Sequence, residues 1–287
     1  MTDLEVERHD SSKPAEATPW ALDKLPPFPA VATRLMEVLA HEDWDVSAVS
    51  QLIAAEPVFA TRLLEMANSP LFALTRQVKT IAHAIVVVGL ARVKAITLTR
   101  ALGDFVGPAL QQRALRVCWQ NSLAGALIAE QLAAPCGMDP DFAYIAGLLR
   151  DIGRLALLVK YPEPYANLLA VSRENAFDLR ATERDLFDID HCEAGAWIMA
   201  RMPFPPELSE VAADHHDRVR GAEFRLVDLV RIADQLADVL GFAVLTAGKQ
   251  PDPEEILKQL PEQFRSRLQF DPEELKAQIE GKLRAWA

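Results

Sequence analysis

Apolar residues recur at three- and four-residue steps along most of the chain, which is the spacing of one buried helix face. The first clear case is the series Phe28, Val31, Leu35, Val38 and Leu39. A repeat of this kind favours an amphipathic helix over a strand, whose apolar residues would alternate. The region therefore opens with a helix that buries one side.

Residues that start and stop helices divide the next stretch into short segments. Asp45 is placed to cap one helix, Pro57 suits the first turn of the next, and NSP at 68–70 ends it. Thr80 can cap IAHAIVVV, and Gly89 can supply a left-handed stop. The run AIVVV alone would also suit a strand, but its helical neighbours and the lack of a partner strand favour a helix.

A second helical region follows GDFVGP at 103–108, where two glycines and a proline mark the expected boundary. The tail contains two DPEE segments, each with a capping Asp, a Pro at the first helical position and glutamates that complement the helix dipole. These segments predict two terminal helices. Between boundary and tail, helices are expected over 109–134, 140–151, within 164–175, 191–202, up to Asp214, and over 226–240.

The predicted fold class is all-α: a bundle of about five short helices packed on a second helical bundle, followed by two terminal helices. The polar start of the chain lacks periodicity, so we expect a mobile arm in which only Trp20 is suited to docking. The expected divisions are the arm at 1–24, the first bundle at 25–106, the second bundle at 107–249 and the terminal helices at 250–287.

Composition narrows the class of protein. Half of the residues are hydrophobic, and the formal net charge of −11 repels phosphate backbones, so no nucleic-acid partner is expected. Cys118, Cys136 and Cys192 are widely spaced, which suggests neither a disulfide framework nor a zinc cluster and fits a reducing cytoplasm. The charged start is unlike a signal peptide, and charged residues interrupt every apolar run short of the ~18–20 residues that a membrane span needs.

Five segments in a fixed order carry a resemblance to a known family. They are LPPFPAVATRLMEVL, EPVFATRLLEMANSPLF, AIVVVGLARVKAITL, GLLRDIG and ADHH. Together they resemble the HDOD family of bacterial signalling proteins, over about residues 25–245. That family is related to the metal-dependent HD phosphohydrolases but usually lacks their full metal site. The resemblance implies an HD-like second bundle and a signalling role.

The resemblance also implies where a metal site would be. An HD phosphohydrolase holds its cation with a histidine, an adjacent His-Asp pair and a further aspartate. Here Asn121 stands at the first position, Arg150 and Asp151 at the pair, and Asp234 at the last. A guanidinium has no lone pair to offer a metal and stays protonated. We therefore expect no catalytic residue, no bound metal and no cofactor.

Two interpretations of Arg150 are open from the sequence. One is a solvated side chain at a helix end, where the dipole favours a cation. The other is a guanidinium that replaces the lost cation and bridges Asp151 or Asp234. Because neighbouring residues on a helix face different ways, Asp234 is the expected partner.

Three histidines extend the candidate site. His191, His215 and His216 resemble positions that supply extra ligands in two-metal relatives of the superfamily, and with Asp151 they could form a residual site or a polar pocket. A histidine in a helical protein is more often a hydrogen-bonded packing residue, which is the opposing interpretation.

The leading hypothesis is a non-catalytic signalling module that acts by binding a protein partner in the cytoplasm; a homodimer is left open. One alternative is a phosphohydrolase of nucleotides or cyclic dinucleotides, with a rearranged site built on Asp151, His191, His215 and Asp234. Another is a nucleotide-binding sensor that keeps the pocket without the chemistry.

Overall fold

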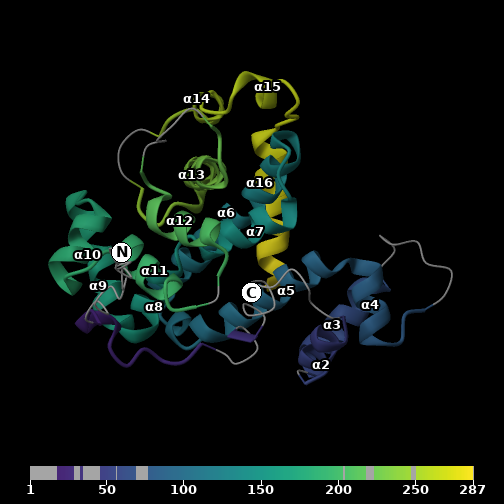
Figure 1. The fold of residues 1–287 in the computed structure, drawn as a ribbon. Coiled ribbons are helices and arrows are strands. Elements are labelled where there is room, and N and C mark those ends of the chain that lie inside the picture. The colour runs from purple at the N-terminus through teal and green to yellow at the C-terminus, as the bar shows by residue number, and fades with distance from the viewer. Residues whose placement is uncertain are drawn as a thin grey trace, which may run out of the picture.

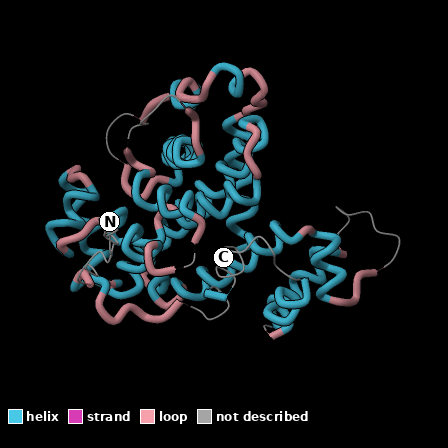
Figure 2. Tube along the Cα trace, viewed as in Figure 1, coloured by secondary structure: helices cyan, strands magenta, loops and turns pink. Residues whose placement is uncertain are grey.

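The structure, a computed structural model, is helical throughout the residues that it describes, with no strand among them (Figures 1 and 2). This confirms the all-α prediction. The described residues are 18–28, 33–34, 46–55, 57–68, 77–202, 204–217, 223–246 and 250–286. The helix expected between Phe28 and Leu39 and the cap at Asp45 lie outside this part of the chain, apart from isolated residues.

Short helices make up the first part of the described chain. The predicted cap at Thr80 is confirmed, since its side chain accepts a hydrogen bond from the backbone of His83 at 3.2 Å. The elements are η1 (Trp20–Leu22), α2 (Val46–Ala54), α3 (Pro57–Ala67), α4 (Ile81–Val88) and α5 (Leu90–Val106).

Gly89 separates α4 from α5 and has a φ of 88°, a left-handed value that favours glycine, as predicted. The two helices meet there at 109°. Among the described residues no single helix has both the length and the apolar character needed to cross a membrane. Helices α4 and α5 together have that length and composition, but they are bent at Gly89.

The remaining helices form the larger part of the molecule. Both DPEE segments start helices as predicted, with Asp252 and Asp271 accepting backbone hydrogen bonds from the first turn. The elements are η3 (Ala109–Gln111), η4 (Arg113–Leu115), α6 (Arg116–Ala133), η5 (Ala134–Cys136), α7 (Pro140–Leu149), α8 (Ile152–Lys160), α9 (Pro162–Asn175), α10 (Leu179–Phe187), α11 (His191–Met199), α12 (Pro206–Asp214), α13 (Leu226–Ala237), η6 (Asp238–Phe242), α14 (Pro253–Leu257), α15 (Glu262–Arg265) and α16 (Pro272–Trp286).

Helices α8 and α10 were not expected from the sequence, and helix boundaries differ most from the expectation at two places. The helix expected from 109 begins only at Arg116, after two short 3₁₀ turns. The helix expected over 140–151 ends at Leu149, and a new helix starts at Ile152. Asp151 between them has a φ of −99° and a ψ of 22°, outside the helical region. This break redirects the chain at the residue pair on which the site depends.

Two hydrophobic cores divide the packing. The smaller core joins α2, α3 and α4 and includes Val93 of α5, with Ile96 packed against it, whereas Ala95 and the buried residues of α5 from Leu98 onward belong to the large core. The change of core therefore lies inside α5. GDFVGP does not interrupt α5 before Val106, because Gly103 and Asp104 continue the helix. Figure 1 shows α2, α3 and α4 projecting from the main bundle.

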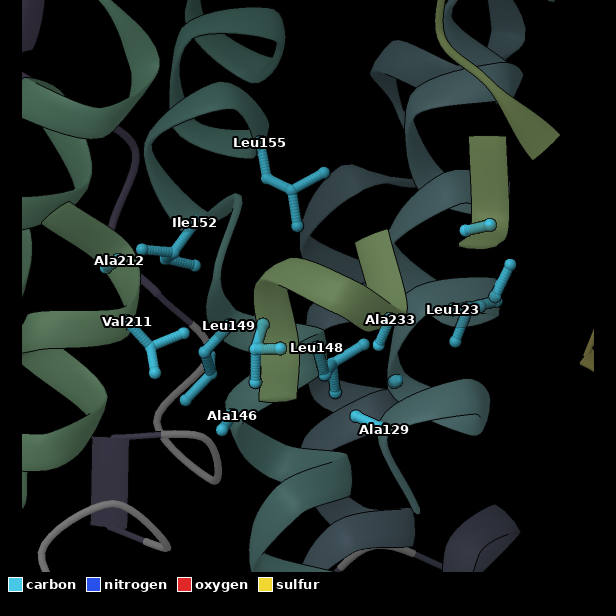
Figure 3. Close-up of a cluster of buried hydrophobic side chains, with 14 of the residues drawn as sticks. Leu123, Ala129, Ala146, Leu148, Leu149, Ile152, Leu155, Val211, Ala212 and Ala233 are labelled. Carbon is cyan, nitrogen blue, oxygen red and sulfur yellow. The ribbon is translucent and has the colours of Figure 1, made fainter. Parts of the chain in front are cut away.

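The large core is built around α6. This helix packs on α7 and α13, and α16 lies along it (Figure 1). Buried Leu148, Leu149 and Ile152 from the α7–α8 segment meet residues of α6, α12 and α13 in Figure 3. The core thus fixes the relative positions of the helix ends that carry the candidate site.

Trp20 anchors the described start of the chain. Its Nε1 donates to Asp188 at 2.8 Å, and its ring lies near Tyr161 and Phe187. Its neighbours Ala21 and Leu22 are buried in the large core. The arm expected over 1–24 therefore does not include residues 20–22, because their apolar side chains find a docking surface that local sequence could not reveal.

Candidate functional site

The four residues singled out from the sequence come from three helices and meet at one point. Asn121 lies on α6, Arg150 and Asp151 lie at the junction of α7 and α8, and Asp234 lies on α13. All four are buried. The packing of α7 and α13 on α6 brings them together across more than a hundred residues of chain.

Arg150 is completely buried and occupies the centre of this group. Its Nε donates to Asp234 Oδ1 at 2.9 Å, and its Nη2 donates to the side-chain oxygen of Asn121 at 2.5 Å. Nη2 also lies 3.3 Å from Asp151 Oδ2. Backbone carbonyls of Asn121, Ser122 and Gly147 accept the remaining hydrogen bonds. The predicted ion pair with Asp234 is present, and the helix-end alternative is excluded for this fully buried side chain.

Gly125 provides the space for the guanidinium. A Cβ atom at this position would lie 2.5 Å from Nη1 and 2.7 Å from Cζ of Arg150. A larger residue at this position of α6 would displace the arginine. The missing side chain of Gly125 thus leaves room for the buried Arg150 guanidinium, which its ion pairs stabilise.

The first metal position of an HD phosphohydrolase is incompatible with these residues. A cation among Asn121, Asp151 and Asp234 would stand where the Arg150 guanidinium already lies, hydrogen-bonded to Asp234 and Asn121 and ion-paired with Asp151. The guanidinium offers no lone pair, and its positive charge would repel the metal. These residues do not fit a metal at that position.

A second guanidinium, that of Arg154 on α8, lies on the opposite side of Asp151. Nη1 of Arg154 is 3.1 Å from Asp151 Oδ1, one helical turn away. Burial alone would raise the pKa of Asp151, but Arg154 and Arg150 hold it well below the ordinary value. Asp151 is therefore an ionised carboxylate between two buried cations.

Three histidines gather beside Asp151. His191 begins α11, and His215 and His216 directly follow α12. Nε2 of His191 lies 3.0 Å from Nε2 of His216, and the Nε2 atoms of His191 and His215 lie 3.6 Å and 3.5 Å from Asp151 Oδ1. One ligand atom from each histidine and from Cys192 lies within 4.8 Å of the others. The structure thus brings together the three histidines and Asp151, which the sequence analysis had grouped as a residual site or a polar pocket.

Glu183 of α10 supports this cluster from behind. Its carboxylate contacts Nδ1 of His191 at 2.6 Å and accepts a hydrogen bond from the Tyr165 hydroxyl. Burial would raise the pKa of Glu183, but His191 and Arg154 lower it below the ordinary value. An ionised Glu183 fixes the orientation of the His191 ring.

A cavity of about 360 Å³ opens beside the cluster. Its walls are Asn121, Arg154, Asp178, Leu179, Arg180, His191, His216, Asp234, Asp238, Val244 and Leu245. Both cations and carboxylates line this space, which is large enough for a small polar molecule. Four of the residues expected from the sequence, Asn121, His191, His216 and Asp234, therefore border a cavity.

Asp238, at the start of η6, is a carboxyl group of this cavity with a strongly raised pKa. Burial and the nearby charge of Asp234 raise its pKa to about 7, while Arg150 and Arg154 act in the opposite direction. The folded protein therefore binds a proton here at pH values at which the unfolded chain has released it.

We expect Asp238→Asn to increase the free energy of unfolding, relative to wild type, more at pH 8 than at pH 5. The raised pKa makes this carboxyl's contribution to stability decline as pH rises from about 4 to 7. The amide cannot ionise and avoids that loss. Urea denaturation of both proteins at the two pH values measures the difference. An equal difference in the free energy of unfolding at both pH values would contradict a raised pKa of Asp238 in the folded protein.

Sequence reasoning missed Arg154, Glu183 and Asp238. Arg154 had a usable signal, since it lies three residues after Asp151 and can share a helix face with it. Asp238 had the same kind of signal, since it lies four residues after Asp234, whereas Glu183 had none. Glu183 is one of several charged residues in RATERD, and only the packing of α10 against α11 distinguishes it from its solvated neighbours.

Comparison with protein families gives one clear match. The model described as HDOD domain matches residues 25–218, more than half of the chain. A protein of Treponema pallidum (strain Nichols), described as uncharacterized, is 24% identical over 198 residues. This match covers 68% of the chain but 38% of that relative, so the chain spans well under half of the relative's length.

Solved structures show the same fold. An HDOD domain protein of unknown function from Geobacter sulfurreducens is 21% identical, with a TM-score of 0.65 over 92% of this chain and 91% of that one. A protein of Shewanella amazonensis SB2B, provisionally named a phosphohydrolase, is 23% identical, with a TM-score of 0.61 over 92% and 94%. A provisionally named signal transduction protein from Marinobacter aquaeolei VT8 is 20% identical, with a TM-score of 0.59 over 91% and 57%.

Proposed function

The chain belongs to the HDOD family, and from that premise we propose that it is a non-catalytic signal-transduction module that acts by binding a protein partner. The HDOD family is related to the HD phosphohydrolases, and structural neighbours of this chain include proteins provisionally named for that activity. The question is therefore whether this chain retains the chemistry of those relatives.

The observation that supports a non-catalytic role is the position of Arg150. Phosphoester hydrolysis by a metal requires an open coordination position for water beside a cation that can polarise the substrate. The Arg150 guanidinium fills that place, completely buried, with donors committed to Asp234, Asn121 and three backbone carbonyls. It can neither deprotonate a water molecule nor coordinate one as a metal does.

The signalling role and the protein partner rest on the family and on the guanidinium at the first metal position. One structural neighbour is provisionally named a signal transduction protein. Affinity capture on the full chain from its native cell, with Arg150→Ala as a variant of altered site, would identify the partner. Capture of no protein at all under native conditions would count against this part of the proposal.

A ligand-sensing function is the second candidate, and the cavity of about 360 Å³ favours it. Arg154 and Arg180 could bind an anionic group there, and Asp234 and Asp238 could accept hydrogen bonds from hydroxyl or amino groups. A thermal-shift screen with nucleotides separates this function from partner binding alone. A melting temperature that no nucleotide changes would leave partner binding as the better explanation.

We expect wild type to hydrolyse neither bis(p-nitrophenyl) phosphate nor cyclic dinucleotides, even with Mn²⁺, Mg²⁺ or Zn²⁺ added. The double variant Asn121→His with Arg150→His should retain one more equivalent of metal than wild type after loading and desalting, because it restores two lost ligands beside Asp151 and Asp234. Elemental analysis measures the metal, and each single variant serves as the control.

The single variants should gain much less metal, since an incomplete ligand shell competes poorly with water. Metal-dependent hydrolysis by wild type would overturn the non-catalytic proposal and favour the rearranged enzyme. A double variant that gains no metal would mean that the two carboxylates no longer converge on a usable position.

A further inference from the structure

A second hollow, of about 850 Å³, lies beside α15, at the end of the molecule that α14 and α15 form in Figure 1. None of its lining residues borders the cavity of about 360 Å³. All of them follow residue 218, where the match to the HDOD domain ends. This surface therefore belongs to the part of the chain that the family match does not cover. The described residues that line it are Glu223, Phe224, Pro261, Glu262, Gln263 and Phe264.

Two phenylalanine rings form the apolar part of the hollow. Phe224 lies just before α13 and Phe264 lies on α15, with ring centroids 5.7 Å apart and ring planes at 54°. Both side chains are half-buried and pack against the large core, which holds the rings in place. A group bound in the hollow thus lies within reach of two preorganised aromatic rings.

The charged groups of the hollow have one sign. Its ionisable described residues are Glu223 and Glu262, and both are exposed. The neighbouring cations have partners of their own, since Arg225 pairs with Glu210 and Arg265 pairs with Glu262. Solvent screens the exposed pair of Arg265 and Glu262, so that pair stabilises little and can be exchanged. The lining is therefore acidic and aromatic.

An arginine side chain matches this lining better than other groups do. Its guanidinium stacks on aromatic rings, forms paired hydrogen bonds with carboxylates and stays charged. A lysine ammonium is more strongly hydrated, so it loses more on leaving water. An anion would be repelled by both glutamates, and a purely apolar group would remove water from them without offering a donor. The net charge of −11 also attracts a basic partner at long range.

We propose that this hollow binds an arginine side chain on a basic segment of a protein partner. The inference rests on the proposed function, because it names the chemistry of the partner that the module binds. Glu223 and Glu262 accept hydrogen bonds from the guanidinium, and Phe224 and Phe264 contact its flat faces. A hollow of about 850 Å³ also has room for residues that flank the arginine.

The test is a calorimetric titration of the full chain with the blocked peptide Gly-Gly-Arg-Gly-Gly-Arg-Gly-Gly. The salt concentration is about 0.15 M, at which exposed charges more than about 8 Å apart are largely screened. The control peptide carries citrulline, the neutral analogue of arginine, at both positions. We expect saturable binding of one arginine peptide per chain, and binding of the citrulline peptide at least about tenfold weaker.

Two sets of variants locate the binding. Glu223→Gln with Glu262→Gln should weaken binding of the arginine peptide at least about tenfold. Glu163→Gln with Glu174→Gln changes two exposed glutamates of α9, alters the net charge equally and should leave binding unchanged. Phe264→Leu keeps an apolar contact with the core but removes the ring, so it should weaken binding about two- to fivefold. Circular dichroism checks that each variant is folded.

Three results would overturn the inference by showing attraction to net charge alone or no site at all. They are equal weakening by the two glutamate pairs, equal binding of the two peptides, and no saturable binding of the arginine peptide by wild type. Two others would assign the hollow to a different occupant. Binding about tenfold tighter in Arg218→Gln with Arg220→Gln would assign it to the chain's own arginines. A wild-type dimer that the Glu223 and Glu262 variant lacks would assign it to a second copy.

Failure of this inference can be separated from failure of the proposed function. A partner that wild type and the Glu223→Gln with Glu262→Gln variant capture equally would bind elsewhere, so the inference would fail and the proposed function would stand. If wild type captured no partner at all, the proposed function itself would fail.

Discussion

Replacing Arg150 with alanine is expected to lower the free energy of unfolding by about 3–5 kcal/mol, the cost of breaking a buried ion pair by removing one partner. The variant leaves Asp234 and the amide oxygen of Asn121 without their donor inside the core. Asp151 keeps Arg154 but loses its second cation. Chemical denaturation at neutral pH measures the change.

A matched control is Arg100→Ala on α5. Arg100 pairs with Asp104 one turn along the helix, and both side chains are largely exposed. Solvent screens such a pair, so its loss should cost about 0.5 kcal/mol or less. If Arg150→Ala cost no more than this control, the guanidinium could not be the cation that holds the three helices together.

Gly153→Ala on α8 is expected to cost at least about 3 kcal/mol, at the upper end of what overpacking a core usually costs. A Cβ atom at this position would lie 2.1 Å from the backbone oxygen of His191 and 2.4 Å from the backbone nitrogen of Gly195. Backbone atoms cannot move aside as a side chain does, so α8 and α11 would have to separate. Thermal and chemical denaturation measure the loss.

The control for this substitution is Gly281→Ala on α16. Its Cβ would come no nearer than 4.0 Å to Arg284, and the position is exposed. Alanine is the better helix former by about 0.5–1 kcal/mol, so this variant should be slightly more stable than wild type. A Gly153 variant that behaved in the same way would show that α8 and α11 are packed less tightly than the structure indicates.

The helical period and the capping residues allowed much of the fold to be predicted, because these signals are local. Thr80, Gly89 and the two DPEE segments all act where the sequence placed them. The end of α7 near Asp151 was predicted within two residues, but the new helix that starts at Ile152 was not.

The candidate site could also be predicted only in part. Asn121, Arg150, Asp151 and Asp234 could be found from the sequence, because the resemblance supplied their positions. The location of the Arg150 charge could not, since a helix-end arginine is more often solvated than buried. Gly125, which makes room for that charge, looked like any small residue within an apolar helix.

Helix α5 belongs to both cores, and this has a consequence for cooperativity. Val93 is held by the small core and Ala95 by the large one, so the helix can lose its first turns while its later turns stay packed. Regions with fewer buried contacts open at lower free energy than the global unfolding transition. Native-state hydrogen exchange should therefore divide α5 into two foldons, with fast-exchanging amides before Lys94 and slow ones from Leu98 onward.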